Sequence, residues 1–475
     1  MLSILFDHRF RRTTLLIFAS LSFLGGALYA QIGNADWLLI LPATLFAPTL
    51  KARKFVALCV IVYGCFILGI IRGGFALQKE VPLQQFMGQK ITLNATITED
   101  GYYDSKKRVT FNANAFEILS PENMTVDVPL RINTFVLPSA TRGEVVQITG
   151  KLYPTLGNVA GSIGFAEVEA IGTTATLLDR ARQKFTSGLR NSMPEPTASF
   201  TSGILIGQRS SLTSKWQDII RDAGLMHIIA VSGYNLTILV RFSKRLLRKQ
   251  SRYQILIASS LLVSTFVLIT GMSPSILRAT IVVALLQLSW FYGRKIHPLV
   301  LLTLSAALSV LYDPFQLWRS VGWYLSFAAF FGVIIMAPLL IPKKRDKSLL
   351  WMLVAESFAA GIMTLPIIAV VFGRVSVVGI LANLLVTPLV PLAMLLSFIA
   401  GLAGWLIPAI SGWFALPARF LLTYMLDISN IVSRLPGARI SLHINNWTLS
   451  GIYIVMCVGI WTLYRHRKPR QYMLE

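Results

Sequence analysis

The chain has 475 residues, of which 54% are hydrophobic and only 14% are charged. This balance excludes an ordinary soluble protein, in which about 25% of the residues are charged. Apolar stretches of about 20 residues recur along the chain, and each is long enough to cross the roughly 30 Å hydrocarbon core of a bilayer. The sequence therefore predicts a polytopic α-helical membrane protein, multi-pass in the cell membrane.

The formal net charge of +23 suggests a polyanionic partner. Membrane topology offers a simpler explanation, because the cytoplasmic loops of membrane proteins collect Lys and Arg. Half of the 44 basic residues fall in six clusters that predict cytoplasmic ends, so the overall charge alone does not indicate DNA binding. The clusters lie at 9–12, 51–54, 241–252, 294–295, 343–347 and 465–470.

The N-terminal apolar segment is interpreted as an uncleaved span rather than a signal peptide. Leu28 is too large for the position two before Ala30, where a cleavage site needs a small residue. The basic run 51–54 lies in the turn between the second and third apolar segments and places this turn in the cytoplasm. The third apolar segment therefore ends outside. Residues 1–74 are therefore expected to form three N-terminal transmembrane helices, at about 13–31, 37–50 and 55–71.

The polar stretch 75–195 is expected to be an extracytoplasmic β domain. Five short runs alternate apolar and polar residues between Gly and Pro, a pattern that predicts a small β-barrel similar to an OB-fold. Such a fold can bind single strands. Residues 79–184, however, hold eleven basic and eleven acidic residues, which favours a structural or docking role over strong DNA capture. The runs are 90–98, 109–115, 130–136, 144–152 and 164–171.

Residues 196–465 are expected to form a transmembrane channel domain, followed by a basic cytoplasmic tail at 466–475. Two parts of this domain do not read as simple crossings. The stretch 199–240 contains one short and one moderate apolar piece, although it must cross an odd number of times. The stretch 376–407 is interrupted by prolines and is expected to make one net crossing. Irregular backbone survives at membrane depth only where it lines protein or water, so both stretches predict a hydrated path.

The first of these stretches contains a polar cluster in the run HIIAVSGYNL at 227–236. His227, Ser232 and Asn235 together offer hydrogen-bond donors and acceptors, and Gly233 permits close backbone approach or local unwinding. These groups are expected to line the path. The alternative is that they only join neighbouring helices through hydrogen bonds.

Arg278 is a second costly residue, because it precedes a long apolar run. A cation there must reach the interface, pair with an anion or face water, and in a cavity it can hold a phosphate through two hydrogen bonds. Glu356 lies inside the apolar stretch 349–371 and is a candidate partner. Asn383 lies in the broken stretch and is expected to cap a half-helix.

No catalytic, metal or cofactor site is expected. All three cysteines lie in apolar segments, and the five histidines form no known metal-binding motif. His227 and Ser232 fall on different faces of a helix and have no orienting carboxylate nearby in sequence, so a membrane-embedded hydrolase is a remote alternative. The chain is therefore not expected to be an enzyme.

The sequence resembles the ComEC family of competence channel proteins over nearly its whole length. The core of the resemblance is LIGQRSSLTSKWQDIIRDAGLMHIIAVSGYNLTIL at 205–239, which carries Gly224, His227, Ala230, Ser232 and Gly233. Further motifs follow in the family's order, as TGMSPSILRA, GRKIHPL, DPFQLWRSVGWYLSFAAFFG and TLPIIAVVFGRVSVVGILANLLVTPLV. The family often has His where Asn235 stands, so the sequence departs from the family's pattern at this position.

The resemblance implies an inner-membrane channel that takes up single-stranded DNA during natural transformation. A DNA receptor and a cytoplasmic DNA-uptake ATPase would be its partners. Larger members carry a C-terminal metallo-β-lactamase-like domain that this sequence lacks, so a separate nuclease is expected to degrade the other strand. The alternative function is a secondary transporter of a small solute or lipid, which would use the same broken helices.

Overall fold

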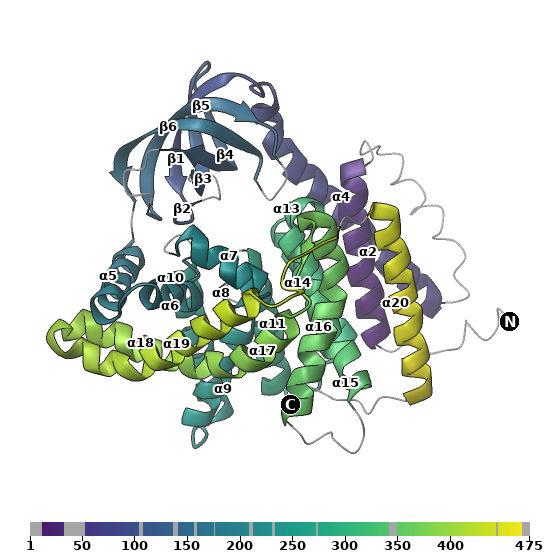
Figure 1. Cartoon of the computed structure of the whole chain (residues 1–475). Coiled ribbons are helices and arrows are strands. Elements are labelled where there is room, and N and C mark those ends of the chain that lie inside the picture. The colour runs from purple at the N-terminus through teal and green to yellow at the C-terminus, as the bar shows by residue number, and fades with distance from the viewer. Residues whose placement is uncertain are drawn as a thin grey trace.

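The computed structural model places a β-barrel on one end of a bundle of helices (Figure 1). The predicted second span, 37–50, lies outside the residues that the structure describes. Those residues are 12–32, 53–103, 108–135, 141–155, 159–174, 176–208, 212–229, 233–271, 274–341, 349–442 and 445–467.

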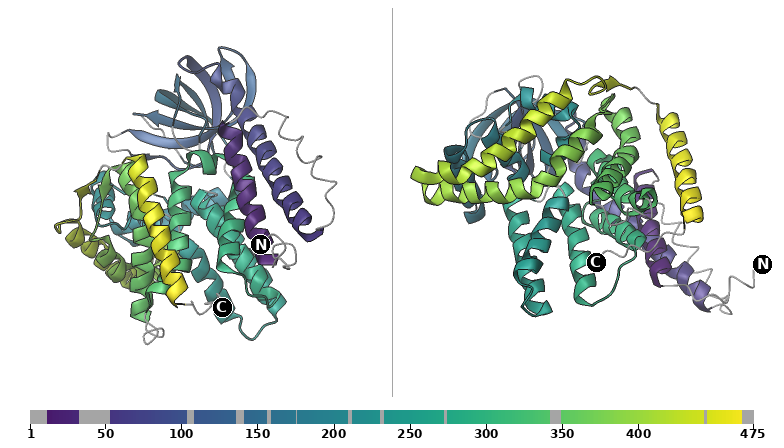
Figure 2. Two further views of the ribbon diagram at one scale, coloured as in Figure 1. Left: turned by 90° about the vertical axis from the view of Figure 1, so that its right-hand side faces the viewer. Right: turned by 60° about the horizontal axis from the view of Figure 1, so that its bottom comes forward.

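Two N-terminal helices lie side by side and correspond to the first and third predicted segments (Figure 2). They are α2 (Arg12–Ile32) and α4 (Arg53–Gln84). Both are long and apolar enough to cross a bilayer. The C-terminal end of α4 leads directly into the first strand of the barrel, so the barrel is held at the end of this helix pair.

Five strands close into a barrel in the order β1, β5, β6, β4, β3 and back to β1. Only β4 and β6 are parallel, and a short sixth strand, β2, extends β3. This closed barrel confirms the predicted OB-like domain. The strands are β1 (Lys90–Ile97), β2 (Tyr102–Tyr103), β3 (Val109–Ser120), β4 (Met124–Thr134), β5 (Glu144–Tyr153) and β6 (Gly161–Thr173).

The apolar side chains of the alternating runs fill the interior of the barrel. Ile91, Leu93 and Ala95 of β1 point inward and are fully buried, and every second residue of the other strands meets them. Successive side chains of a strand point to opposite faces, so an apolar residue at every second position builds one continuous core. The polar residues between them remain on the outer surface of the barrel.

The helical part confirms a polytopic membrane protein. Among the described residues, seven helical stretches are long and apolar enough to cross a bilayer. The helices that run along the bundle are α9 (Gly233–Leu246), α10 (Arg252–Thr270), α11 (Pro274–Phe291), α12 (Pro298–Tyr312), α14 (Val321–Phe331) with η3 (Gly332–Met336) and α15 (Ala337–Leu340), α16 (Leu349–Phe372) and α20 (Asn446–Arg467), and the short α13 (Phe315–Arg319) precedes α14.

A group of short helices lies between the barrel and the bundle (Figure 1). Every residue of α6 is buried, which accounts for its apolar sequence despite a length too short to cross a bilayer. The group consists of α5 (Leu177–Ser192), α6 (Thr197–Ile206), α7 (Ser214–Asp222) and α8 (Met226–Ile229).

The apolar stretch 376–433 has a direction of its own among the apolar helices. It forms a hairpin of helices that runs across the direction of α2, α16 and α20 (Figures 1 and 2). The short strands before and after the hairpin pair with each other, so the chain leaves and returns at the same place. The expected net crossing by 376–407 stays a prediction, because the β7–β8 pairing concerns the whole hairpin and each of its two arms is long and apolar enough to span a bilayer. The elements are β7 (Arg374–Val375), α17 (Gly379–Val386), η5 (Thr387–Leu389), α18 (Val390–Leu406), η6 (Pro408–Ile410), α19 (Ser411–Ser433) and β8 (Ile440–Ser441).

Close packing against α5 holds this hairpin in place. A Cβ atom on Gly404 of α18 would lie 2.0 Å from the carbonyl oxygen of Gly188 in α5, so only glycine allows the two backbones to approach this closely. Hydropathy reports the length and apolar character of α18, but it carries no information about this contact.

Candidate functional site

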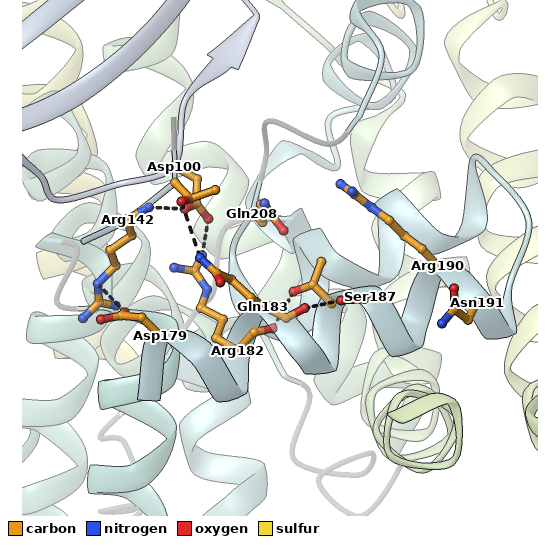
Figure 3. A pocket seen from close by; sticks show the side chains of 11 residues that line it. Asp100, Arg142, Asp179, Arg182, Gln183, Ser187, Arg190, Asn191 and Gln208 are labelled. Atoms are coloured by element: carbon orange, nitrogen blue, oxygen red, sulfur yellow. Dashed lines mark hydrogen bonds and ion pairs between the residues drawn. The ribbon is translucent and has the colours of Figure 1, made fainter. Parts of the chain in front are cut away.

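A polar cavity of about 360 Å³ lies where the barrel meets α5 (Figure 3). Its size falls within the roughly 300–1,000 Å³ of typical ligand sites. The barrel supplies Asp100, Thr141 and Arg142, and Gln208 comes from the loop after α6. The remaining lining residues belong to α5 and are Asp179, Arg182, Gln183, Thr186, Ser187, Arg190 and Asn191.

The spacing of polar residues in α5 builds this wall. They recur every three or four positions from Asp179 to Asn191, so they share one face of the helix. A capping box starts the helix, because the Asp179 N–H donates to the Thr176 hydroxyl at 3.3 Å and the Thr176 N–H donates to the Asp179 carboxylate at 2.9 Å. Gly188 and Leu189 are buried, and Gly188 packs against α18. The helix thus separates the polar cavity from the apolar hairpin.

Ion pairs neutralise most of the charge in the cavity. The Asp100 carboxylate accepts from Arg182 Nη2 at 2.6 Å and from the backbone N–H of Arg142 at 2.9 Å. Arg142 Nε lies 3.4 Å from an Asp179 oxygen. Burial lowers the pKa of Arg182, and Asp100 opposes this shift. An arginine remains protonated at neutral pH even so.

Arg190 is the exception. Its side chain is exposed at the cavity (Figure 3), and it forms no ion pair with any residue in the described part of the chain. The hydroxyl groups of Thr186 and Ser187 line the same wall. Both hydroxyl groups donate to backbone carbonyl groups of α5, so the exposed guanidinium of Arg190 is the group of this wall that can bind phosphate or another anion.

Arg142 connects the cavity to the membrane bundle. Its Nη1 donates to the carbonyl oxygen of Leu268 at 3.4 Å, at the C-terminal end of α10, where exposed carbonyl groups favour a cation. The next helix, α11, begins at Pro274 and carries Arg278 one turn later. The cavity and Arg278 therefore both adjoin the α10–α11 connection.

Arg278 is buried and forms no ion pair with any described residue. Only 3% of the residue is exposed. Its Nη2 donates to the carbonyl oxygen of Gly322 at 2.9 Å and to the Ser275 hydroxyl at 3.3 Å. Within the described ranges, Nε and Nη1 are buried and have no hydrogen-bond partner. Burying a cation without an anion is costly, and in membrane proteins such a residue usually marks a functional site.

The expected pair between Arg278 and Glu356 is absent from the ion pairs of the described residues. Glu356 is half-buried in α16, and the cation that acts on its carboxylate is Arg241 of α9. Glu356 therefore belongs near the basic end of α9 rather than beside Arg278.

Asn383 does not cap a helix as expected. It lies inside α17, and its backbone oxygen accepts from the Thr387 N–H at the end of that helix. Its side-chain oxygen is buried and has no hydrogen-bond partner among the described residues. Asn383 thus places a polar side chain inside the hairpin, but the predicted capping role is wrong.

The structure brings together the two stretches that were predicted to share a path. Gly224, just before α8, has a φ of +72°. A Cβ atom there would lie 2.9 Å from Cα of Gly379, the first residue of α17. His227 follows in α8 and is exposed. The tight glycine contact therefore places the His227 turn against the helix that carries Asn383.

Two of the three remaining predicted path residues sit at the start of α9. Gly233 is the first residue of this helix and Asn235 lies in its first turn. Ser232 lies outside the described residues. These positions follow α8 directly in the chain, so they belong to the same region as His227.

The profile of the competence protein family matches residues 204–467. This range is more than half of the chain and includes His227, Arg278, Glu356 and Asn383. The chain belongs to the competence protein family.

The chain is also similar to two curated proteins. The chain is 24% identical over 219 residues to ComE operon protein 3 of Bacillus subtilis, covering 46% of this chain and 27% of that protein. It is 25% identical over 252 residues to the uncharacterized protein YcaI of Escherichia coli, covering 49% of this chain and 33% of that protein. These matches span about a third or less of the relatives' own length. No solved structure matches.

The arginine-lined cavity of this competence protein lies mostly outside the family match, and the sequence analysis did not find it. Asp100 and Arg182 lie 82 positions apart in sequence and come together only through the barrel. The polar face of α5 was the available signal, because its residues recur at helical spacing from 179 to 191. The described residues contain no group of three or more His, Cys, Asp or Glu that could hold a metal ion.

Proposed function

We propose that this chain forms the inner-membrane path through which single-stranded DNA is taken up during natural transformation. Membership of the competence protein family supports this function. The structural observation that carries it is Arg278, a buried cation near the start of α11 whose Nε and Nη1 have no partner among the described groups. A DNA phosphate would supply the missing anion.

The arrangement of cations supports a route from the barrel into the bundle. Arg190 and Arg182 line the cavity, Arg142 reaches from the cavity to the end of α10, and Arg278 follows in α11. Phosphates on a strand that moved along this series would meet a cation at each stage. His227 and Asn383 would add neutral contacts farther along the path.

The basic clusters support an extracytoplasmic barrel. The α9–α10 connection and the C-terminal end of α20 lie at the end of the bundle opposite the barrel (Figure 1). Both carry dense Lys and Arg, which favour the cytoplasmic side. An emerging strand would therefore meet positive charge there. A DNA receptor would act on the barrel side, and an uptake ATPase and a separate nuclease would complete the pathway.

A transformation assay tests this function in a strain that lacks the chromosomal gene and expresses the variant protein. We expect Arg278→Gln to lower the frequency of transformation by about 100-fold or more, in line with the loss of a buried charged contact. Arg278→Lys keeps the charge and should retain part of the activity. Immunoblots of the membrane fraction control for protein level.

The same strain distinguishes the alternatives. If deletion leaves transformation normal and abolishes uptake of a small solute or lipid, the chain is a transporter and the proposal is wrong. If Arg278→Gln is present at normal level and transforms like the unmodified protein, the proposed role of Arg278 is wrong.

A further inference from the structure

Three exposed aromatic side chains form a row across the outer surface of the barrel. Tyr153, Phe165 and Phe135 come from β5, β6 and the end of β4, which are neighbouring strands (Figure 1). They are 42%, 69% and 57% exposed, respectively. The rings of Phe135 and Phe165 lie 5.6 Å apart. A Cβ atom on Gly164 would lie 3.5 Å from the Tyr153 ring, so this ring covers the backbone just before Phe165.

The backbone of Phe165 is strained. Its φ is +52°, and it is the one non-glycine residue with a positive φ among those described. The residue sits at an irregularity in the β5–β6 pairing, between the pairs Thr149–Glu167 and Lys151–Gly164. A bulge of this kind redirects a side chain, and the left-handed region is unfavourable for a bulky residue. The strain turns a phenyl ring outward, where it contributes little burial.

Cations lie beside the row in positions that do not favour stability either. Lys151 lies 5.8 Å from the centre of the Tyr153 ring. Lys90 of β1 pairs directly opposite Lys151, and two like charges facing each other across strands destabilise a sheet. Arg131 precedes Phe135 by four residues on the same face of β4. Glu167 and Glu169 follow Phe165 on β6 and make that part of the barrel surface acidic. The basic part of the surface around the row is therefore at Lys90 and Lys151.

The chemistry of this row favours a nucleic acid over a protein partner. The barrel is closed, so a peptide cannot add to a free edge at these strands. The aromatic rings stand among polar and charged side chains, Glu167 included, rather than in a continuous apolar patch. Exposed aromatic rings with adjacent cations are the combination that stacks bases and contacts phosphates in proteins that bind single strands.

We infer that Tyr153, Phe165 and Phe135 form a stacking platform for the bases of single-stranded DNA on the outside of the barrel. The inference rests on the proposed function, since it assigns DNA as the occupant. Lys151, Lys90 and Arg131 contact the phosphates of the bound strand. The platform is separate from the arginine-lined cavity, whose residues come from the barrel loops, α5 and the loop after α6.

Binding of fluorescent oligothymidylate to the full chain in lipid nanodiscs tests the platform. A second oligonucleotide of equal length and charge, built of abasic nucleotides, measures the phosphate contribution alone. The double variant Phe135→Ala/Phe165→Ala should bind oligothymidylate at least about tenfold more weakly, because each stacked base contributes roughly 5-fold to 150-fold. Binding of the abasic strand should not change. Phe116→Ala is the matched control, because Phe116 is 41% exposed on β3, away from the row.

Two single variants keep the test independent of folding. Phe165→Gly should weaken binding of oligothymidylate while thermal stability stays the same or rises, because glycine adopts the positive φ without strain. A structural phenylalanine would instead lower the stability. Phe165→Trp should preserve binding, and oligothymidylate should quench its fluorescence.

The possible outcomes separate this inference from the proposed function. If the double variant binds both oligonucleotides like the unmodified chain, the platform does not exist, although uptake through the bundle can still hold. If that variant keeps its oligonucleotide affinity but loses transformation, the row docks a protein and the inference is wrong. If the unmodified chain binds no single strand and its deletion leaves transformation normal, the proposed function itself fails.

Discussion

Two buried or partly buried arginines, Arg319 and Arg278, have surroundings that differ completely, although the carbonyl partner of Arg278 lies only three residues after Arg319. Arg319 of α13 holds both carboxylate oxygens of Glu80 at 2.9 Å. It also contacts the barrel through the carbonyl oxygen of Val159 and lies 4.8 Å from the Phe315 ring. Arg278 meets the carbonyl group of Gly322 and no carboxylate among the described residues.

The difference separates a structural cation from a binding cation. Glu80 lies in α4 and Val159 in the barrel, so Arg319 joins three parts of the molecule and its charge is neutralised there. Arg278 joins α11 to α14 through one carbonyl group and remains positive. A fold gains nothing from the second arrangement that a neutral residue would not supply, so its charge needs a ligand to account for it.

The largest expected effect breaks the neutralised pair. Glu80→Gln removes the carboxylate and leaves Arg319 without a counter-ion in a partly buried site. We expect the free energy of unfolding to fall by about 3–4 kcal/mol, as when one partner of a buried ion pair is removed. Unfolding in a graded series of SDS and mild detergent measures it. A loss below about 1 kcal/mol would mean that solvent screens this pair as at a surface.

A somewhat smaller loss of stability is expected when a neutralised arginine is left without its counter-ion, as Arg278 is among the described residues. Asp100→Asn removes the carboxylate that holds Arg182 in the cavity, and should cost about 2–3 kcal/mol of stability. The cavity then gains one net positive charge. Its affinity for inorganic phosphate or single-stranded DNA should rise, which isothermal titration measures. A stability loss without any gain in anion affinity would contradict the view that uncompensated arginines mark binding sites here.

The smallest stability effect is expected at Arg278. Arg278→Met removes a buried charge and one hydrogen bond to Gly322 while keeping an extended apolar side chain. We expect stability to stay the same or to rise by about 1 kcal/mol, because apolar residues replace buried charges at little or no cost. The same SDS titration measures it. A loss as large as that for Glu80→Gln would mean that Arg278 has a neutralising partner and is structural.

The barrel and the helical part also differ in how far the sequence predicts them. The barrel follows from local pattern, because the alternation in 90–98 and the later runs decides which side chains point inward. Polar groups inside an apolar run singled out His227, the cost of a charge in an apolar run singled out Arg278, and the family resemblance includes both positions. These signals are local in the chain, so no structure was needed to find them.

The remainder depends on contacts between distant residues. Hydropathy gave α18 enough length to cross a bilayer, but its direction depends on the contact of Gly404 with Gly188. The cavity requires Asp100 to meet Arg182 across the barrel–α5 junction. Glu356 was expected beside Arg278. The expectation failed because the sequence does not place the helices that carry these two residues relative to each other. The cation that acts on the Glu356 carboxylate is Arg241.

An exposed arginine provides the finest test of the comparison. Like Arg278, Arg190 has no ion-pair partner among the described residues, but it faces solvent, so a phosphate held there competes with salt. Arg190→Gln should weaken binding of single-stranded DNA only a few-fold, and should lower the slope of log affinity against log salt by about 0.7, the value for one phosphate contact on a single strand. Arg180→Gln is the control, because Arg180 is exposed on the same helix and does not line the cavity. An equal change of slope in both variants would show that α5 attracts DNA only through its overall charge. A change confined to Arg190 would place a phosphate in the cavity, where the neutralised Arg182 and Arg142 form the wall and the free guanidinium binds.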